Sequence, residues 1–362
     1  MLAGNHGNRN KLTNNIMNIK RIVFLAVITC FACGCYEDYV RDYDYDAVAI
    51  AYQYDLRSFV VGEGMEFKIG AMLGGVLSND RNRKVDIVID DELVNGDLSS
   101  YVSSETSFTA FDVMSGASNA GTVSSKYVTD AVNAAVTANG ISSLVPLPSN
   151  LYSVEPLNMV IKKGKHTATA VVSVDSAAFL STPNIGHLPH YAIGYRIVSA
   201  DADKVIKEKS FGVIALRIES RFFGNWYHGG VSKVLNAAGE EISRNTYYTR
   251  IPAADASSAV YSLTTTGPFS VSANWFHNSD GKMDIIIGED GAVTVADPES
   301  RITDLGSSWN EDVLLQNRKI YMNYQYPDAD GNTVVVTDTL TFRNRVLDGI
   351  NEYQDNNPEH YK

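Results

Sequence analysis

The chain has 362 residues, a formal net charge of −12 and a pI near 5.0. This acidic balance argues against a nucleic-acid-binding protein, because phosphates select a basic surface. The 20 tyrosines and 27 glycines, together with many Val, Thr and Ser residues, favour antiparallel β-sheets joined by polar turns.

An apolar segment near the N-terminus predicts a secretory signal peptide. Lys20 and Arg21 precede an apolar run over 22–31, and small residues follow up to Cys35. A membrane-spanning helix needs about 20 apolar residues, and this run is roughly half as long, so we expect it to be cleaved. The small residues before Cys35 resemble a bacterial lipobox, in which Cys35 becomes the lipidated first residue of the mature protein. Cys33 is the alternative acceptor.

Residues 1–35 are therefore predicted to be an upstream extension followed by a lipoprotein signal peptide, with Met17 as the start. All three cysteines of the chain lie in this part, which leaves the mature protein without a thiol for catalysis or a disulfide. Residues 36–46 are acidic and rich in tyrosine, which predicts a solvated tether. Glu37-Asp38 directly after the lipidated cysteine resembles the export signal of Bacteroidetes-type surface lipoproteins.

Strand patterns begin at Ala47. Residues 84–90 alternate between apolar and polar side chains, which predicts a half-buried strand. Residues 99–143 depart from this pattern because they are rich in Ser, Thr, Ala and Gly. Apolar residues at helical spacing predict one helix near 124–139 within this long insertion. Packing and ligand binding both remain open as its role.

A family resemblance appears in the stretch that follows the insertion. It rests, in chain order, on Leu147-Pro148, Tyr152, Ile161, Gly164, Tyr191, Ile193 and Ser199-Ala200-Asp201. This order resembles the N-terminal domain family of Bacteroidetes glycan-utilisation lipoproteins, which also precedes the catalytic domain of some endo-β-N-acetylglucosaminidases. The resemblance covers roughly 47–217. It implies an immunoglobulin-like β-sandwich, and we place this domain at 47–218.

A second β domain is predicted over 224–345. Hairpin signals lie at 283–295 and 319–342. The opening Gly-Asn-Trp-Tyr, these hairpins and the stretch 306–310 together resemble the C-terminal domain that commonly follows the first family. We therefore predict an all-β protein whose second domain is a compact antiparallel barrel or sandwich.

The chain is long enough for two separate cores once the leader is set aside. Glu219 to Phe223 is the predicted junction, which we expect few contacts to cross. Residues 346–362 are predicted to be a polar, frayed tail.

Candidate catalytic and metal-binding residues form no recognisable constellation. Glycoside hydrolysis needs two paired carboxylates, and the nearest match, the aspartates within 42–46, lies in the tether. The turn at 328–332 lacks the distal Glu of a calcium loop. His187 and His190 flank a proline, which disfavours the helix of a zinc-binding pair. We predict no enzyme activity, no metal and no cofactor.

Aromatic residues remain as candidates for function. Sugars present apolar C–H faces edged by hydroxyls, so their sites combine a flat ring with polar side chains. The candidate glycan-binding residues are Trp275, His277, Asn278, Trp309, Asn310 and Tyr324. Trp275 is expected to be the most exposed because it precedes a turn, and core packing is the alternative for each ring. Trp226 is expected to be structural.

The predicted signal peptide, the lack of a catalytic constellation and the family resemblance together predict a non-catalytic lipoprotein. We expect it to be lipid-anchored on the outer membrane and exposed at the cell surface. It would bind a polysaccharide or oligosaccharide and pass it to an outer-membrane glycan transporter complex. The alternative is a structural or adhesive surface lipoprotein, such as a fimbrial or assembly component. A weaker alternative is an accessory subunit of a glycoside hydrolase.

Overall fold

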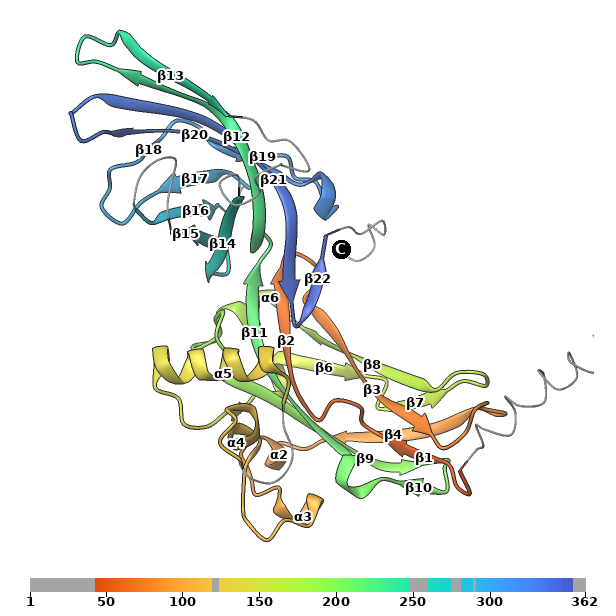
Figure 1. The fold of residues 1–362 in the computed structure, drawn as a ribbon. Coiled ribbons are helices and arrows are strands. Elements are labelled where there is room, and N and C mark those ends of the chain that lie inside the picture. The colour runs from red at the N-terminus through yellow and green to blue at the C-terminus, as the bar shows by residue number, and fades with distance from the viewer. Residues whose placement is uncertain (1–42, 119–123, 248–259, 275–280, 289–290, 354–362) are drawn as a thin grey trace, which may run out of the picture.

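Strands dominate the computed structural model, which describes residues 43–118, 124–247, 260–274, 281–288 and 291–353 (Figure 1). The signal peptide, Cys35 and most of the tether lie outside these residues. Within the described ranges, no helix has the length and apolar character needed to cross a membrane. The predicted all-β class is confirmed.

The first domain is a sandwich of two sheets. One sheet has the strand order β10-β1-β3-β8-β6. Its strands are β1 (Ala47–Ala49), β3 (Glu66–Gly74), β6 (Tyr152–Glu155), β8 (Thr167–Val174) and β10 (Lys204–Val205). The other sheet has the order β2-β11-β9-β4-β7, with β5 beside β9. Its strands are β2 (Tyr54–Val61), β4 (Arg83–Ile89), β5 (Val145–Pro146), β7 (Asn158–Ile161), β9 (Tyr191–Ala200) and β11 (Phe211–Ser220).

The apolar positions of alternating strands fill the space between the two sheets. On β4, Val85 and Ile87 are buried in this core whereas Lys84 is exposed, as the alternation predicts. Because β1 and β2 belong to different sheets, the chain crosses from one sheet to the other at residues 50–53. β2 then runs parallel to β11, so the domain is not purely antiparallel.

The insertion forms a third layer on the outer face of the sheet that contains β2. Its helix α5 (Lys126–Asn139) confirms the helix predicted near 124–139 and ends before Gly140. Val128 and Val132 of α5 pack with Tyr54 and Leu56 of β2 in a second apolar cluster. The smaller helices are α2 (Glu92–Asn95), α3 (Ser99–Val102), α4 (Ala110–Met114) and α6 (Ser176–Leu180), with 3-10 turns at Ser149–Leu151, Lys207–Lys209 and Leu315–Asn317.

The second domain is one curled antiparallel sheet with the order β17-β16-β15-β14-β12-β21-β20-β18. Its first six strands are β12 (Gly224–Leu235), β13 (Glu241–Tyr247), β14 (Val260–Gly267), β15 (Ser270–Ala273), β16 (Met283–Ile287) and β17 (Val293–Ala296). The remaining ones are β18 (Thr303–Asp304), β19 (Ser308–Trp309), β20 (Lys319–Pro327), β21 (Thr333–Leu347) and β22 (Ile350–Glu352). Both predicted hairpins are confirmed, as β16 with β17 and β20 with β21.

The two ends of this sheet approach each other and nearly close a barrel. The Val295 amide of β17 donates a hydrogen bond to Asp304 Oδ1 of β18 at 3.2 Å. Trp226 lies fully buried inside, and its Nε1 donates to the Phe222 carbonyl at 2.9 Å, which confirms its structural role. Asp338, the one polar residue on an apolar face of β21, lies 3.2 Å from His228 Nδ1.

The C-terminal segment differs from the predicted polar tail. β21 continues to Leu347, and β22 pairs back along it. Arg345 Nε donates to Glu352 Oε2 at 2.6 Å, which holds this short hairpin in place. Its turn carries Asp348 and points toward the first domain, where it meets β2 (Figure 1).

A buried carboxylate joins the two domains. Glu63 lies in the turn after β2, and its side chain is only 5% exposed. Arg318 and Arg345 of the second domain each approach it to 2.7 Å, one at each carboxylate oxygen. Burial alone would raise the pKa of Glu63, but the charges of Arg345 and Arg318 outweigh it and hold the pKa below its ordinary value. The turn itself favours Gly62, whose φ of 80° lies in the left-handed region that side chains other than glycine rarely adopt.

A second contact covers the edge of β2. The Ser58 amide and hydroxyl donate to the two carboxylate oxygens of Asp348, at 2.9 and 2.7 Å. Burial raises the pKa of Asp348. At the junction, Thr265 donates to the buried Glu219 carboxylate. Buried polar contacts therefore cross the junction, and independent folding of the two domains stays a prediction.

We expect Glu63→Gln to destabilise the protein. Removing the charge leaves Arg318 and Arg345 buried beside a neutral amide, and breaking a buried ion pair from one side costs about 3 to 5 kcal/mol. Urea unfolding at neutral pH measures this loss. Glu66→Gln is the matched control, because Glu66 is an exposed carboxylate on the adjoining strand β3.

The difference in stability between wild type and Glu63→Gln should depend on pH. A carboxylate with a lowered folded pKa contributes its full stability above the ordinary value of 4.5, and loses it as the pH falls through the folded pKa. The stability gap between wild type and Glu63→Gln should therefore be constant above pH 4.5 and shrink below it. A variant as stable as wild type at neutral pH would show that this pairing does not hold the domains together.

Candidate functional site

The predicted glycan-binding residues do not form one site in the described part of the chain. Trp275, His277 and Asn278 lie outside the described residues. Asn310 is exposed, but its side chain is hydrogen-bonded to the loop that follows it. Its Nδ2 donates to the Asn317 carbonyl at 2.8 Å, and its Oδ1 accepts from the Lys319 amide at 2.9 Å. These two hydrogen bonds fix local structure and leave little of the amide for a ligand.

The side chain of Trp309 packs against the core. Its ring lies 5.4 Å from that of Phe222, centroid to centroid, in an edge-to-face arrangement. The Arg221 guanidinium carbon lies 5.2 Å from the same ring centroid. The ring thus has neighbours that a sugar would have to displace. For Trp309, core packing is the interpretation that the structure supports.

The prediction that Tyr324 binds a glycan is wrong. Its side chain is fully buried, because β20 alternates and directs Tyr324 to the interior with Ile320 and Met322. Tyr321, another tyrosine of β20, points outward and is 37% exposed. A row of tyrosines in sequence therefore splits between the two faces of the strand.

We expect Trp309→Ala to lower stability and leave saccharide affinity unchanged. Truncating a packed tryptophan costs about 3 to 5 kcal/mol, and partial exposure places Trp309 at the lower end of this range. Thermal melting and calorimetric titration of the same variant separate the two effects. A variant that melts as wild type but loses affinity would restore Trp309 as a binding residue.

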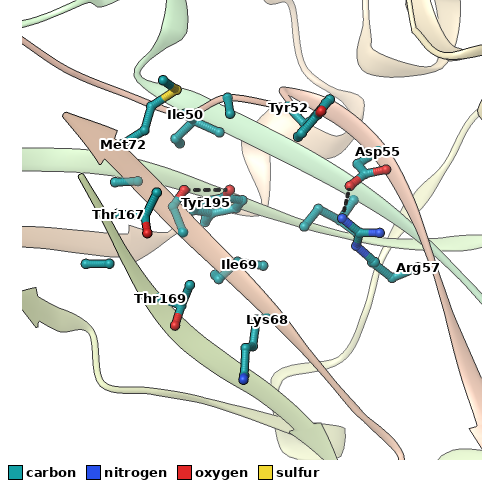
Figure 2. A pocket seen from close by; sticks show the side chains of 15 residues that line it. Ile50, Tyr52, Asp55, Arg57, Lys68, Ile69, Met72, Thr167, Thr169 and Tyr195 are labelled. Atoms are coloured by element: carbon teal, nitrogen blue, oxygen red, sulfur yellow. Dashed lines mark hydrogen bonds and ion pairs between the residues drawn. The ribbon is translucent and has the colours of Figure 1, made fainter. Parts of the chain in front are cut away.

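A cleft lies at the open side of the first domain, where the chain crosses between the two sheets (Figure 2). Its volume is about 180 Å³. Ile69 and Ala71 of β3 and Ile214 of β11 form an apolar floor, while β2 contributes Asp55 and Arg57. The cleft exists because β1 pairs with β3 only at residues 72–74 and then leaves the sheet.

The crossing segment that forms one rim is held by backbone hydrogen bonds. The Ile50 amide donates to the Lys209 carbonyl at 2.7 Å, and the Val213 amide donates to the Gln53 carbonyl at 2.6 Å. Between these two anchors, Tyr52 extends into solvent and is 69% exposed. The cleft therefore has a flat ring on a fixed segment at its entrance.

An ion pair forms the polar wall of the cleft. Arg57 Nη2 lies 2.6 Å from Asp55 Oδ2, and the Asp55 side chain is only 5% exposed. The other oxygen of Asp55 accepts from the Leu56 amide at 2.9 Å and from the Tyr127 hydroxyl of α5. Burial, and then the hydrogen bond to Asp55, raises the pKa of Tyr127. The insertion helix thus fixes the orientation of this carboxylate.

The opposite wall is formed by β3 and β8. Figure 2 shows Thr167 and Thr169 across the cleft from Asp55 and Arg57. Gly70 lets the two strands approach, because a Cβ there would lie 2.5 Å from the Ala168 carbonyl oxygen. The apolar floor is therefore bordered by a ring, a carboxylate, a guanidinium and hydroxyls.

Sequence reasoning missed this cleft, although β2 carries a local signal for it. Asp55 and Arg57 occupy the same face of β2 as Phe59, which is buried between the sheets. Two charges on a core-facing stripe are typical of a cavity or an ion pair. The described residues contain no group of three or more His, Cys, Asp or Glu side chains suited to a metal ion.

Comparison with known proteins supports the fold. A family model described as "-like, N-terminal domain" matches residues 98–204, within the first domain. No curated protein matches the sequence. A Bacteroides ovatus protein of unknown function has a similar structure, with 17% sequence identity and a TM-score of 0.54, covering 86% of this chain and 99% of that chain. At this identity the likeness shows a shared fold.

Two further Bacteroides ovatus structures are similar at lower scores. One has unknown function, 10% identity and a TM-score of 0.35, covering 85% of this chain and 97% of that chain. The other is a candidate carbohydrate-binding protein from strain ATCC 8483, with 12% identity and a TM-score of 0.27, covering 85% and 72%. These scores are too low to carry an argument about function.

Proposed function

We propose that the cleft of the first domain binds a sugar unit of a polysaccharide or oligosaccharide. The observation that carries this proposal is the exposed Tyr52 ring beside an apolar floor that is bordered by the Asp55–Arg57 ion pair. The C–H face of a sugar suits the ring and the floor, and its hydroxyls suit the carboxylate and the guanidinium.

The cleft is preorganised but small. The hydrogen bonds that fix Asp55 and the crossing segment remove ordering costs that would otherwise weaken binding. A volume of about 180 Å³ lies below that of typical sites for small molecules, so we infer that one sugar unit is bound and that affinity is micromolar to millimolar. Several anchored copies on one long glycan would gain avidity.

Binding suits this cleft better than catalysis. Hydrolysis of a glycosidic bond uses two carboxyl groups, roughly 5 to 9.5 Å apart. Asp55 is the only carboxylate among the residues that line the cleft, and its ion pair engages it. We therefore propose a non-catalytic surface lipoprotein that delivers glycans to an outer-membrane transporter complex.

We expect Tyr52→Ala to weaken saccharide binding without lowering the melting temperature. A stacked ring contributes on the order of 0.5 to 1.5 kcal/mol, which corresponds to about a 2- to 12-fold change in Kd. A glycan array selects the ligand, and calorimetry measures each Kd. Tyr353→Ala is the control, because Tyr353 is a comparably exposed tyrosine at 58%. Equal losses in both variants, or none in either, would refute the assignment to the cleft.

The membrane anchor has its own test. Each buried CH₂ of an acyl chain contributes about 0.8 kcal/mol, so several chains on Cys35 would hold the protein firmly at the membrane. Cys35→Ala should move the protein from the membrane fraction to the soluble fraction, whereas Cys30→Ala should not. Membrane association that survives the replacement of both Cys33 and Cys35 would contradict the lipoprotein proposal.

A further inference from the structure

A second cavity lies apart from the cleft, at the C-terminal end of α5. Its volume is about 580 Å³, within the range of 300 to 1,000 Å³ that is typical of small-molecule sites. One wall is the end of the insertion helix with Asn139 and Ile141. The other is the loop between α6 and β9, which contributes Asn184, His187 and His190.

The polar side chains of this cavity have unused hydrogen-bonding capacity. Within the described ranges, the side chains of Asn139, Asn184, His187 and His190 make no hydrogen bond or ion pair with the protein. Two amides and two imidazoles supply both donors and acceptors. Four such groups around one hollow can bind a ligand that itself carries several donors and acceptors.

The loop between α6 and β9, which forms one wall of the cavity, is held in place by hydrogen bonds that do not involve the side chains of the two asparagines and two histidines. The Ile218 amide donates to the Gly186 carbonyl at 2.8 Å, and the Val145 amide donates to the His190 carbonyl at 3.0 Å. The Tyr191 hydroxyl donates to the Pro183 carbonyl at 3.1 Å. The cavity is therefore formed before a ligand arrives, and little ordering cost remains for binding.

The charge of the cavity limits the class of ligand. No Asp, Glu, Lys or Arg is among the residues that line it. Burial, and then the charge of Arg217, lowers the pKa of His187, so its imidazole is neutral at neutral pH. Ile141, Ile185 and Leu188 add an apolar part to the lining. A charged ligand would find no counter-charge among the residues that line the cavity, whereas an uncharged, hydroxyl-rich ligand with an apolar face fits.

We infer that this cavity is a second binding site, which takes a neutral sugar unit through hydrogen bonds to Asn139, Asn184, His187 and His190. It differs from the cleft in kind, because no tyrosine, tryptophan or phenylalanine ring lines it and stacking contributes nothing. The site uses other residues than the cleft, so either proposal can fail without the other. It also gives the insertion a role in binding in addition to its packing.

The test uses the full chain with Tyr52→Ala, in which the cleft is weakened. Saturation-transfer NMR and calorimetry are run with the methyl glycosides of glucose, galactose, mannose and N-acetylglucosamine, and with glucuronate as the charged comparison. We expect at least one neutral glycoside to bind and glucuronate to bind at least tenfold more weakly.

The decisive variant is Asn139→Ala/Asn184→Gly. Asn184 has a φ of 64°, and glycine keeps this conformation while it removes the amide. We expect affinity for the neutral glycoside to fall roughly tenfold or more, because two hydrogen bonds are lost. Asn133→Ala, at an exposed position of α5 that does not line the cavity, should bind unchanged. If the double variant melts lower, Asn139→Ala alone, at the exposed helix end, gives the same test.

Three results would overturn this inference. The first is that no neutral glycoside of the panel binds the Tyr52→Ala protein. The second is that binding persists at full strength in Asn139→Ala/Asn184→Gly. The third is stoichiometric Zn²⁺ binding that His187→Ala abolishes, without sugar binding, which would make the cavity a metal site.

Discussion

The buried carboxylate of Glu63 between Arg318 and Arg345 fixes how the two domains meet. An ionised carboxylate is costly to bury alone, and two guanidiniums from the second domain offset that cost. Glu63 lies in the turn that follows β2, and Asp348 covers the edge of the same strand at Ser58. The second domain therefore holds this edge strand of the first domain at two points, and at Ser58 it occupies a backbone amide that an edge strand would otherwise expose.

The same strand carries the polar wall of the cleft. Asp55 and Arg57 lie only a few residues before Ser58, so the contacts that position β2 against the second domain also position the ion pair. From the other side, Tyr127 of α5 donates to Asp55. The insertion and the second domain thus both support the proposed sugar site, although neither supplies a residue that lines it. A rigid wall suits a weak surface site, because little entropy is lost on binding.

Local sequence patterns predict several helices and strands of this fold. The cleft and the contact between the domains depend instead on residues that lie far apart in the sequence. Alternation predicted β4, and helical spacing followed by Asn139-Gly140 predicted α5. The turn Gly62-Glu63-Gly64 reads as an ordinary exposed turn, because the partners of Glu63 lie 255 and 282 residues away in the chain. The cleft depends on β2 pairing with β11, which no local pattern encodes. Tyr324 was predicted from its residue type and polar surroundings, and only the register of β20 shows that its ring points into the core.

The most direct test of the glycan-binding account is a crystal structure with the saccharide that a glycan array selects. The account predicts a sugar ring against Tyr52, with hydroxyls within hydrogen-bonding distance of Asp55 or Arg57, and no rearrangement of the crossing segment at 50–53. Sugar bound only to the second domain, with the cleft of the first domain empty, would contradict it.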